Sequence, residues 1–177
     1  DVHLTNNGGI AFDGRSSATD AGGTAWFNIP AAGEVTGVDL LGDRVTVDAD
    51  ALYGPRVEAR DAPMDLATEG PTDIDVIAGG ASVDIGAGAL TIGEAVAGAA
   101  FTAGTVARNG VNGAQTFGEV IAKGPIELDA DGTVTAERLI SETAGIDVNA
   151  NAAAITELGK AATTLGVVTL GFQDHRA

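Results

Sequence analysis

The chain contains no cysteine, which excludes disulfide bonds and thiolate metal sites. Aromatic residues make up only 4% of its 177 residues, so it lacks the large anchors of an ordinary globular core. Basic residues are also scarce, because 9 Lys and Arg stand against 25 Asp and Glu, for a net charge of −16. This balance argues against nucleic acid and anionic lipid as partners, since both require basic patches. No apolar run approaches the ~18 residues of a transmembrane helix, so we expect no membrane insertion.

Histidine is almost as scarce as cysteine. His3 and His175 lie at opposite ends of the chain, and in an elongated fold they could not share a catalytic or metal site. Ser–His–Asp and Cys–His arrangements need a central histidine. The basic and aromatic residues are scattered, whereas a polysaccharide-cleaving site clusters them with acids. We therefore predict that the protein is not an enzyme, and a polysaccharide-active β-helix is the less favoured alternative.

A degenerate repeat near the C-terminus is the most informative pattern that is present. The segment 126–130 (IELDA) returns as 146–150 (IDVNA) and, more loosely, as 168–172 (VTLGF). Apolar and polar residues alternate within each copy, as they do in a strand with one buried face. A period near 20 residues with this alternation is typical of a β-solenoid, in which successive copies stack as parallel strands.

Stacking determines which residues become neighbours. Ile126 should lie under Ile146, and Leu128 under Val148, with each buried side chain contributing roughly 1.5–3 kcal/mol. Strand anchors along the chain predict roughly eight short coils and a rod of about 40 Å. These anchors are Val2, Ala25, Val45, Ile74, Phe101, Ile126, Ile146 and Val168. We expect one all-β domain over 1–177, a parallel β-helix (β-solenoid). Because neither end carries an obvious amphipathic cap, and a solenoid needs caps or neighbours to stay soluble, we interpret it as a segment of a longer chain or a repeating filament subunit.

Glycine, proline and small polar residues mark the expected connections. Proline is tolerated at a strand start but not inside a hydrogen-bonded ladder, so Gly-Pro pairs are interpreted as corners between coils. These pairs lie at 54–55, 70–71 and 124–125. Three segments rich in turn-forming residues are expected to be loops. They are 15–23, 60–72 and 109–113.

Other patterns are ambiguous or negative. A helix over 152–162 (AAAITELGKAA) is the alternative to a strand there, although Gly159 interrupts it. Threonine shows no recurrent outward position, which argues against a flat ice-binding ladder. The glycines around 86–88 do not open a helix after a strand, so they do not indicate a phosphate-binding loop.

Acidic residues occupy outward positions of the expected strands. Glu127 should stack beside Asp147, where two carboxylates about 4–5 Å apart repel each other by about 1 kcal/mol in water. Asn149 beside Asp129 should relieve one such clash. We interpret these positions as a solvated acidic face, with cation binding between coils as the alternative.

The segment 127–134 (ELDADGTV) resembles the start of an EF-hand calcium loop. Glu127, Asp129 and Asp131 fill its first three acidic positions, followed by Gly132. The position that requires a bidentate glutamate is Arg138, and no flanking helices are evident. Asp131 and Gly132 are more simply a turn between strands. Glu127, Asp129 and Asp131 are nevertheless the candidate metal ligands, for calcium, and no other cofactor is expected.

Three phrases resemble a known family. They are DVHLTNNGGI at 1–10, IELDADGTVTA at 126–136 and IDVNANAAAITELG at 146–159. This text is similar to repeats of filamentous-haemagglutinin-type exoproteins, which are large secreted bacterial adhesins. The resemblance implies a right-handed parallel β-helix, an extracellular or cell-surface location, and an adhesive or structural rod.

The expected function is that of a non-catalytic extracellular adhesin or structural surface-filament segment. Its partners would be a host or neighbouring-cell surface, or further copies of the chain in a fibre. A calcium-dependent surface-layer or assembly protein is the alternative, since an acidic face could be bridged by metal.

Overall fold

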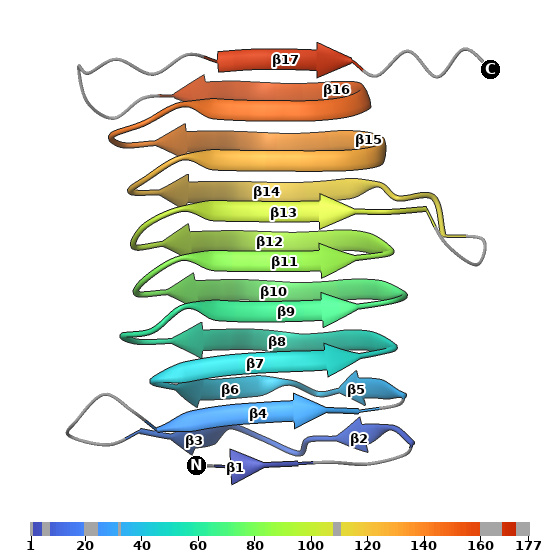
Figure 1. Ribbon diagram of the computed structural model, residues 1–177, viewed down its shortest axis with the longest axis vertical. Coiled ribbons are helices and arrows are strands. Elements are labelled where there is room, and N and C mark those ends of the chain that lie inside the picture. The colour runs from blue at the N-terminus through green and yellow to red at the C-terminus, as the bar shows by residue number, and fades with distance from the viewer. Residues whose placement is uncertain are drawn as a thin grey trace.

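The computed structural model describes residues 2–4, 8–19, 25–31, 33–107, 111–159 and 168–172, whose regular structure is entirely β-strand. Parallel strands stack along one axis from the N-terminal to the C-terminal end of a rod (Figure 1). The described residues form about seven turns, close to the roughly eight expected, so the parallel β-solenoid prediction is confirmed. None of them belongs to a helix that could cross a membrane.

Most turns consist of one short and one long strand (Figure 1). The short strands are β1 (Val2–His3), β4 (Trp26–Pro30), β7 (Arg44–Ala49), β9 (Met64–Thr68), β11 (Val83–Ala87), β13 (Phe101–Thr105) and β17 (Val168–Phe172). The long strands are β8 (Ala51–Ala59), β10 (Pro71–Gly79), β12 (Ala89–Ala97), β14 (Gln115–Ala122), β15 (Ile126–Ser141) and β16 (Ile146–Gly159). The early turns use the shorter β2 (Ile10–Ala11), β3 (Ser16–Ala18), β5 (Glu34–Thr36) and β6 (Asp39–Gly42). Segments 126–130 of β15 and 146–150 of β16 pair with the short strands, and together these form the short-strand sheet.

One register column runs the length of this sheet. It contains Val2, Phe27, Val45, Met64, Val83, Phe101, Ile126, Ile146 and Val168. Ile126 pairs with Ile146, and Leu128 with Val148, as predicted. All four of these side chains are at most 2% exposed. The core is therefore a narrow stack of apolar side chains, each supported by the turns above and below.

The predicted anchor Ile74 is wrong. Two turns lie between Val45 and Phe101, and their residues in this column are Met64 and Val83. Ile74 belongs to β10, on the long-strand side. The prediction merged two turns of about 19 residues each into one, because the strand that contains Met64 lies in a stretch with prolines that resembles a loop.

That stretch, 60–72, was expected to be a loop, but it contains β9 and the start of β10. The expected loop 15–23 likewise contains β3 within its described part. Residues 112–114 do lie outside the strands, as expected of the loop 109–113. The helical alternative over 152–162 is wrong for 152–159, which form the second half of β16; residues 160–162 lie outside the described residues.

Each long strand bends near its middle. In β12 the bend places Gly93 and Glu94 outward between the buried Ile92 and Ala95, and the register to the next turn skips Gly93. Two of the predicted Gly-Pro corners, 70–71 and 124–125, do connect successive strands. The third, 54–55, is instead the bend inside β8. Bends and corners together let each turn close around the core.

Successive turns approach most closely at the corners. Gly80 follows β10, and its amide donates a hydrogen bond of 2.7 Å to the Ala59 carbonyl of the preceding turn. A Cβ on Gly80 would overlap the backbone carbonyl oxygen of Arg60. Glycine is required here because the two backbones leave no space for a side chain. Gly86, on the outer surface of β11, is the opposite case, since a Cβ there would meet no atom within 4 Å.

We expect Gly80→Ala to destabilise the solenoid by about 1–3 kcal/mol, the usual cost of forcing extra atoms into a packed site. Gly86→Ala is the matched control and should be neutral or slightly stabilising, because glycine weakens a strand interior. Urea unfolding followed by circular dichroism gives the two midpoints. Equal midpoints would contradict the close approach at the corner.

Candidate functional site

Carboxylates line up along the outer surface of the short-strand sheet. Asp65 pairs with Asp84, Glu127 pairs with Asp147, and Thr102 joins the two pairs. The four acids are exposed. Neighbouring strands lie about 4.8 Å apart, so the carboxylates of each pair are close enough to repel each other. We call these five residues the acidic column, and the predicted stacking of Glu127 on Asp147 is confirmed.

Next to the acidic column, three successive turns carry almost no side chain. Ala67, Gly86 and Gly104 are register neighbours, and a Cβ on either glycine would meet no atom within 4 Å. Two hollows of about 460 and 400 Å³ lie here, and both are lined by Gly86 and Gly104. We call this joint depression the trough.

Acidic residues surround the trough. Asp84 and Glu127 of the acidic column line its larger hollow. Glu69, which follows the end of β9, lines the smaller one. Asp48 and Asp129 occupy the two ends of the register column that forms the floor. A ligand in the trough would therefore meet negative charge on several sides.

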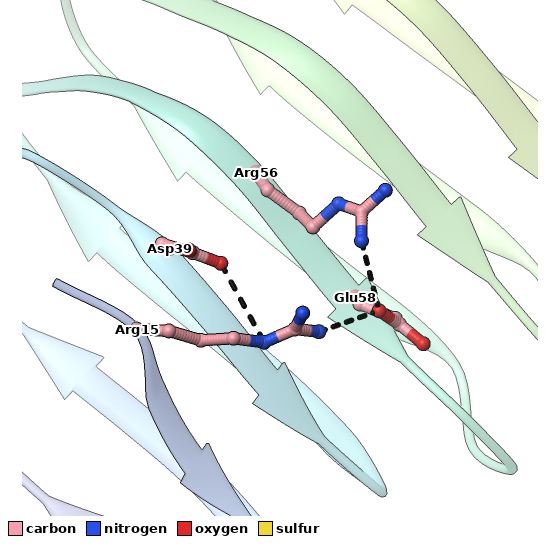
Figure 2. Close-up of polar contacts among 4 residues, drawn as sticks. All are labelled: Arg15, Asp39, Arg56 and Glu58. Carbon is pink, nitrogen blue, oxygen red and sulfur yellow. Dashed lines mark hydrogen bonds and ion pairs between the residues drawn. The ribbon is translucent and has the colours of Figure 1, made fainter.

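Arginines neutralise acids on the long-strand side. The Arg15 guanidinium lies 2.9 Å from a Glu58 carboxylate oxygen and 3.7 Å from Asp39 (Figure 2). Arg56 lies 3.8 Å from the same Glu58 oxygen (Figure 2). These contacts join segments from three turns, but the side chains are partly exposed, so each pair adds about 0–1 kcal/mol.

A second network on that side forms around Arg138. Its guanidinium lies 2.6 Å from a Glu119 carboxylate oxygen and 3.5 Å from Glu157. By contrast, within the described ranges no ion pair involves the acidic column, Asp48 or Glu69. Among the described residues, the negative charge around the trough therefore has no basic partner.

Burial raises the pKa of Asp84 above its ordinary value of 3.8, and the neighbouring Asp65 carboxylate raises it further. A hydrogen bond from the Ile85 backbone N–H lowers the pKa and opposes part of this shift. The ionised form of Asp84 is therefore disfavoured in the folded chain. This is the electrostatic consequence of placing like charges one turn apart.

Two of the three predicted metal ligands, Asp129 and Asp131, have separate hydrogen-bond partners. Asp129 accepts a hydrogen bond of 3.2 Å from the Asn149 side-chain amide, which confirms the predicted neighbours. Asp131 accepts one of 3.3 Å from the Ala107 backbone N–H. In the part of the chain that the structure describes, no three His, Asp or Glu side chains are grouped to hold a metal ion. Calcium binding by Glu127, Asp129 and Asp131 stays a prediction.

The segment that contains these acids is part of a strand and has no flanking helices. β15 continues through Asp131 and Gly132, and its register to β16 shifts between Ala130 and Thr133. The predicted turn at Asp131 is thus a corner that β15 passes without a break. This geometry differs from an EF-hand loop, in which the ligands wrap around one ion.

Sequence reasoning missed Gln115. Its side chain is fully buried, and its Nε2 donates hydrogen bonds of 2.9 Å to the Ala103 carbonyl and 2.8 Å to the Asp129 carbonyl. Ala103 and Asp129 belong to adjacent turns and both line the larger hollow. The available signal was a polar residue at an inward position, where the register neighbours are Leu90 and Val134.

Two further features lie away from the trough. His3 is exposed, and its ring is edge-on to Trp26 with centroids 5.9 Å apart; His175 lies outside the described residues. On the long-strand side, Thr91, Thr116 and Thr135 stack in register and are exposed. The expectation that threonine lacks a recurrent outward position is therefore wrong for these three turns.

The arrangement around the trough can bind cationic groups, because unpaired carboxylates face a surface depression. Comparison of the chain with protein-family models, with curated proteins and with solved structures finds no match. The candidate site is therefore defined by register, charge and shape.

The raised pKa of Asp84 gives a stability prediction. Its folded-state pKa exceeds the unfolded value, so ionisation of Asp84 destabilises the folded chain. This destabilisation is fully present above the folded pKa and disappears as pH falls below about 3.8. Asp84→Asn should raise the melting temperature at pH 7, and the gain in the free energy of unfolding should be less than about 1 kcal/mol because the group is largely exposed. The gain should vanish near pH 3. Asp75→Asn, an exposed acid on β10, is the control, and a lower melting temperature for Asp84→Asn at pH 7 would contradict the assignment.

Proposed function

We propose that this chain is a segment of a non-catalytic extracellular adhesin or structural surface filament, of the filamentous-haemagglutinin type that its repeats resemble. The observation that carries the proposal is the register-locked stack of turns that presents the acidic column and the trough on one exposed sheet. Such a stack holds surface residues at fixed spacings over many turns, which suits multivalent contact with another surface.

Charge supports the same role. A net charge of −16 favours solubility and keeps exposed rods from associating without specificity. A cysteine-free chain held by a repeated backbone ladder does not depend on the redox state of its surroundings. Both properties fit an extracellular or cell-surface location.

The adhesive role can be tested with oriented beads. Because the chain has no cysteine, a single Glu94→Cys on exposed β12 would attach it to a bead with the short-strand sheet outward. We expect these beads to adhere to cultured epithelial cells or to bacteria, and to lose adhesion when Ile126→Asp is added. That second change buries a charge in the core, which costs several kcal/mol.

Electron microscopy tests the filament role on the same protein. A single rod should be about 40 Å long, whereas a structural filament subunit should assemble into longer particles. Single rods on the grid, together with beads that adhere no better than the Ile126→Asp control, would refute both halves of the proposal.

A calcium-dependent surface-layer or assembly role is the second candidate. The observation that favours it is the stacking of Glu127 on Asp147, since a divalent cation between two like charges would remove their repulsion. Calcium would then raise the melting temperature by ligand linkage, and a chelator would lower it. The variant Glu127→Gln/Asp147→Asn should lose this response. A melting temperature that changes with neither calcium nor chelator would exclude the calcium role.

A further inference from the structure

The ion pairs among the described residues all lie on the long-strand side. None of them involves the acidic column, Asp48 or Glu69. The strands β9, β11 and β13 and the segments 126–130 and 146–150 contain neither Lys nor Arg. The segments that carry the acidic column therefore supply no basic residue to neutralise it.

The trough is longer and wider than an ion site. Its register column passes from Asp48 through Ala67, Gly86 and Gly104 to Asp129. Four steps at about 4.8 Å give a length of roughly 19 Å, which an extended polypeptide covers with about six residues. The two hollows share Gly86 and Gly104 as lining residues, and their volumes of about 460 and 400 Å³ fall in the range of ligand pockets.

The lining of the trough combines hydrocarbon with carboxylates. Ala67, Ala87 and Val106 line the smaller hollow, and Val106 is 47% exposed although it is apolar. A Lys or Arg side chain matches this surface, because its aliphatic stem packs on hydrocarbon while its charged end reaches a carboxylate. Asp84 and Glu127 are placed to receive such ends.

We propose that the trough is the docking groove for an extended polypeptide segment of a partner that carries Lys or Arg at alternate positions. This inference names the partner class for the proposed adhesive surface and rests on that function. A bound segment would follow the axis of the solenoid, with its basic side chains directed to the acidic column, because alternate residues of an extended chain point to one side. A small polyamine carries the same charge, but its thin chain would leave much of the hollow unfilled.

The test uses the whole chain and a fluorescein-labelled peptide of alternating Lys and Ala, seven residues long, with its Glu–Ala counterpart as the negative probe. Fluorescence anisotropy at low ionic strength should detect binding of the Lys peptide and not of the Glu peptide.

The variant Gly86→Thr/Gly104→Thr fills the trough without changing any charge. We expect it to lose at least about tenfold in affinity, or about 1.4 kcal/mol. Ala154→Thr, which extends the exposed column of Thr116 and Thr135, should bind as the unaltered chain does.

A charge-matched pair of variants separates site from net charge. Asp84→Asn/Glu127→Gln and Asp75→Asn/Glu94→Gln remove the same charge, one pair from the trough and the other from the bends of the long strands. The first pair should weaken binding more than the second. Circular dichroism confirms that every variant is folded.

Several results would overturn the docking groove: no binding of the Lys peptide, unchanged binding to the filled trough, or equal losses from both charge pairs. If spermine binds as tightly as the peptide when the two affinities are compared per positive charge, the trough is instead a site for small cations. Beads carrying the filled-trough variant that still adhere to cells would leave the adhesive function standing and remove this inference alone. Peptide binding without bead adhesion would remove the adhesive function.

Discussion

Parallel backbone pairing between each residue and its counterpart one turn away is the constraint on which this structure depends. Because strands alternate their side chains, one register fixes both the inward stack and the outward columns at once. Ile126 on Ile146 and Glu127 on Asp147 are consequences of the same pairing. A core stack therefore cannot form without also bringing outward residues into line, whether or not their charges agree.

Sequence periodicity predicted the fold where the strands were long and the repeat clear. The pairing of Ile126 with Ile146 follows from copies of equal pattern at nearly equal spacing. The turn containing Met64 was missed because Pro63 and Pro71 flank a strand of only 5 residues. Two such prolines look like a loop when the neighbouring turn is unknown. Tertiary pairing supplies what the local pattern lacks, which is why this strand was missed.

The candidate site was less accessible to prediction than the fold. The acids themselves were evident, and so was the partnership of Asn149 with Asp129. The trough was not, because Gly86 and Gly104 become neighbours only when the 18-residue step between Val83 and Phe101 is known. Gln115 was missed for a related reason, since the carbonyls it binds belong to turns that the sequence does not place beside it. Shape and buried polar contacts both depend on register across turns.

Charge is distributed by the same geometry. Arg15 and Arg138 contact acids that lie one or two turns away. Nothing in the order of residues along the chain separates these acids from those around the trough. Among the described residues, the folded chain nevertheless has its ion pairs on one side and an unpaired column of acids on the other. Electrostatic asymmetry of this kind is a property of the coil and not of any local segment.

The corner between β13 and β14 illustrates how this architecture accommodates change. Residues 106–114 separate these strands, whereas Gly88 alone separates β11 from β12. Yet Phe101 still pairs with Ile126, and Leu90 with Gln115. The pairing of the flanking strands is thus independent of the length of the corner. Insertions and deletions at corners can therefore change the outer shape of such a rod during evolution without changing the strands that pair in its core.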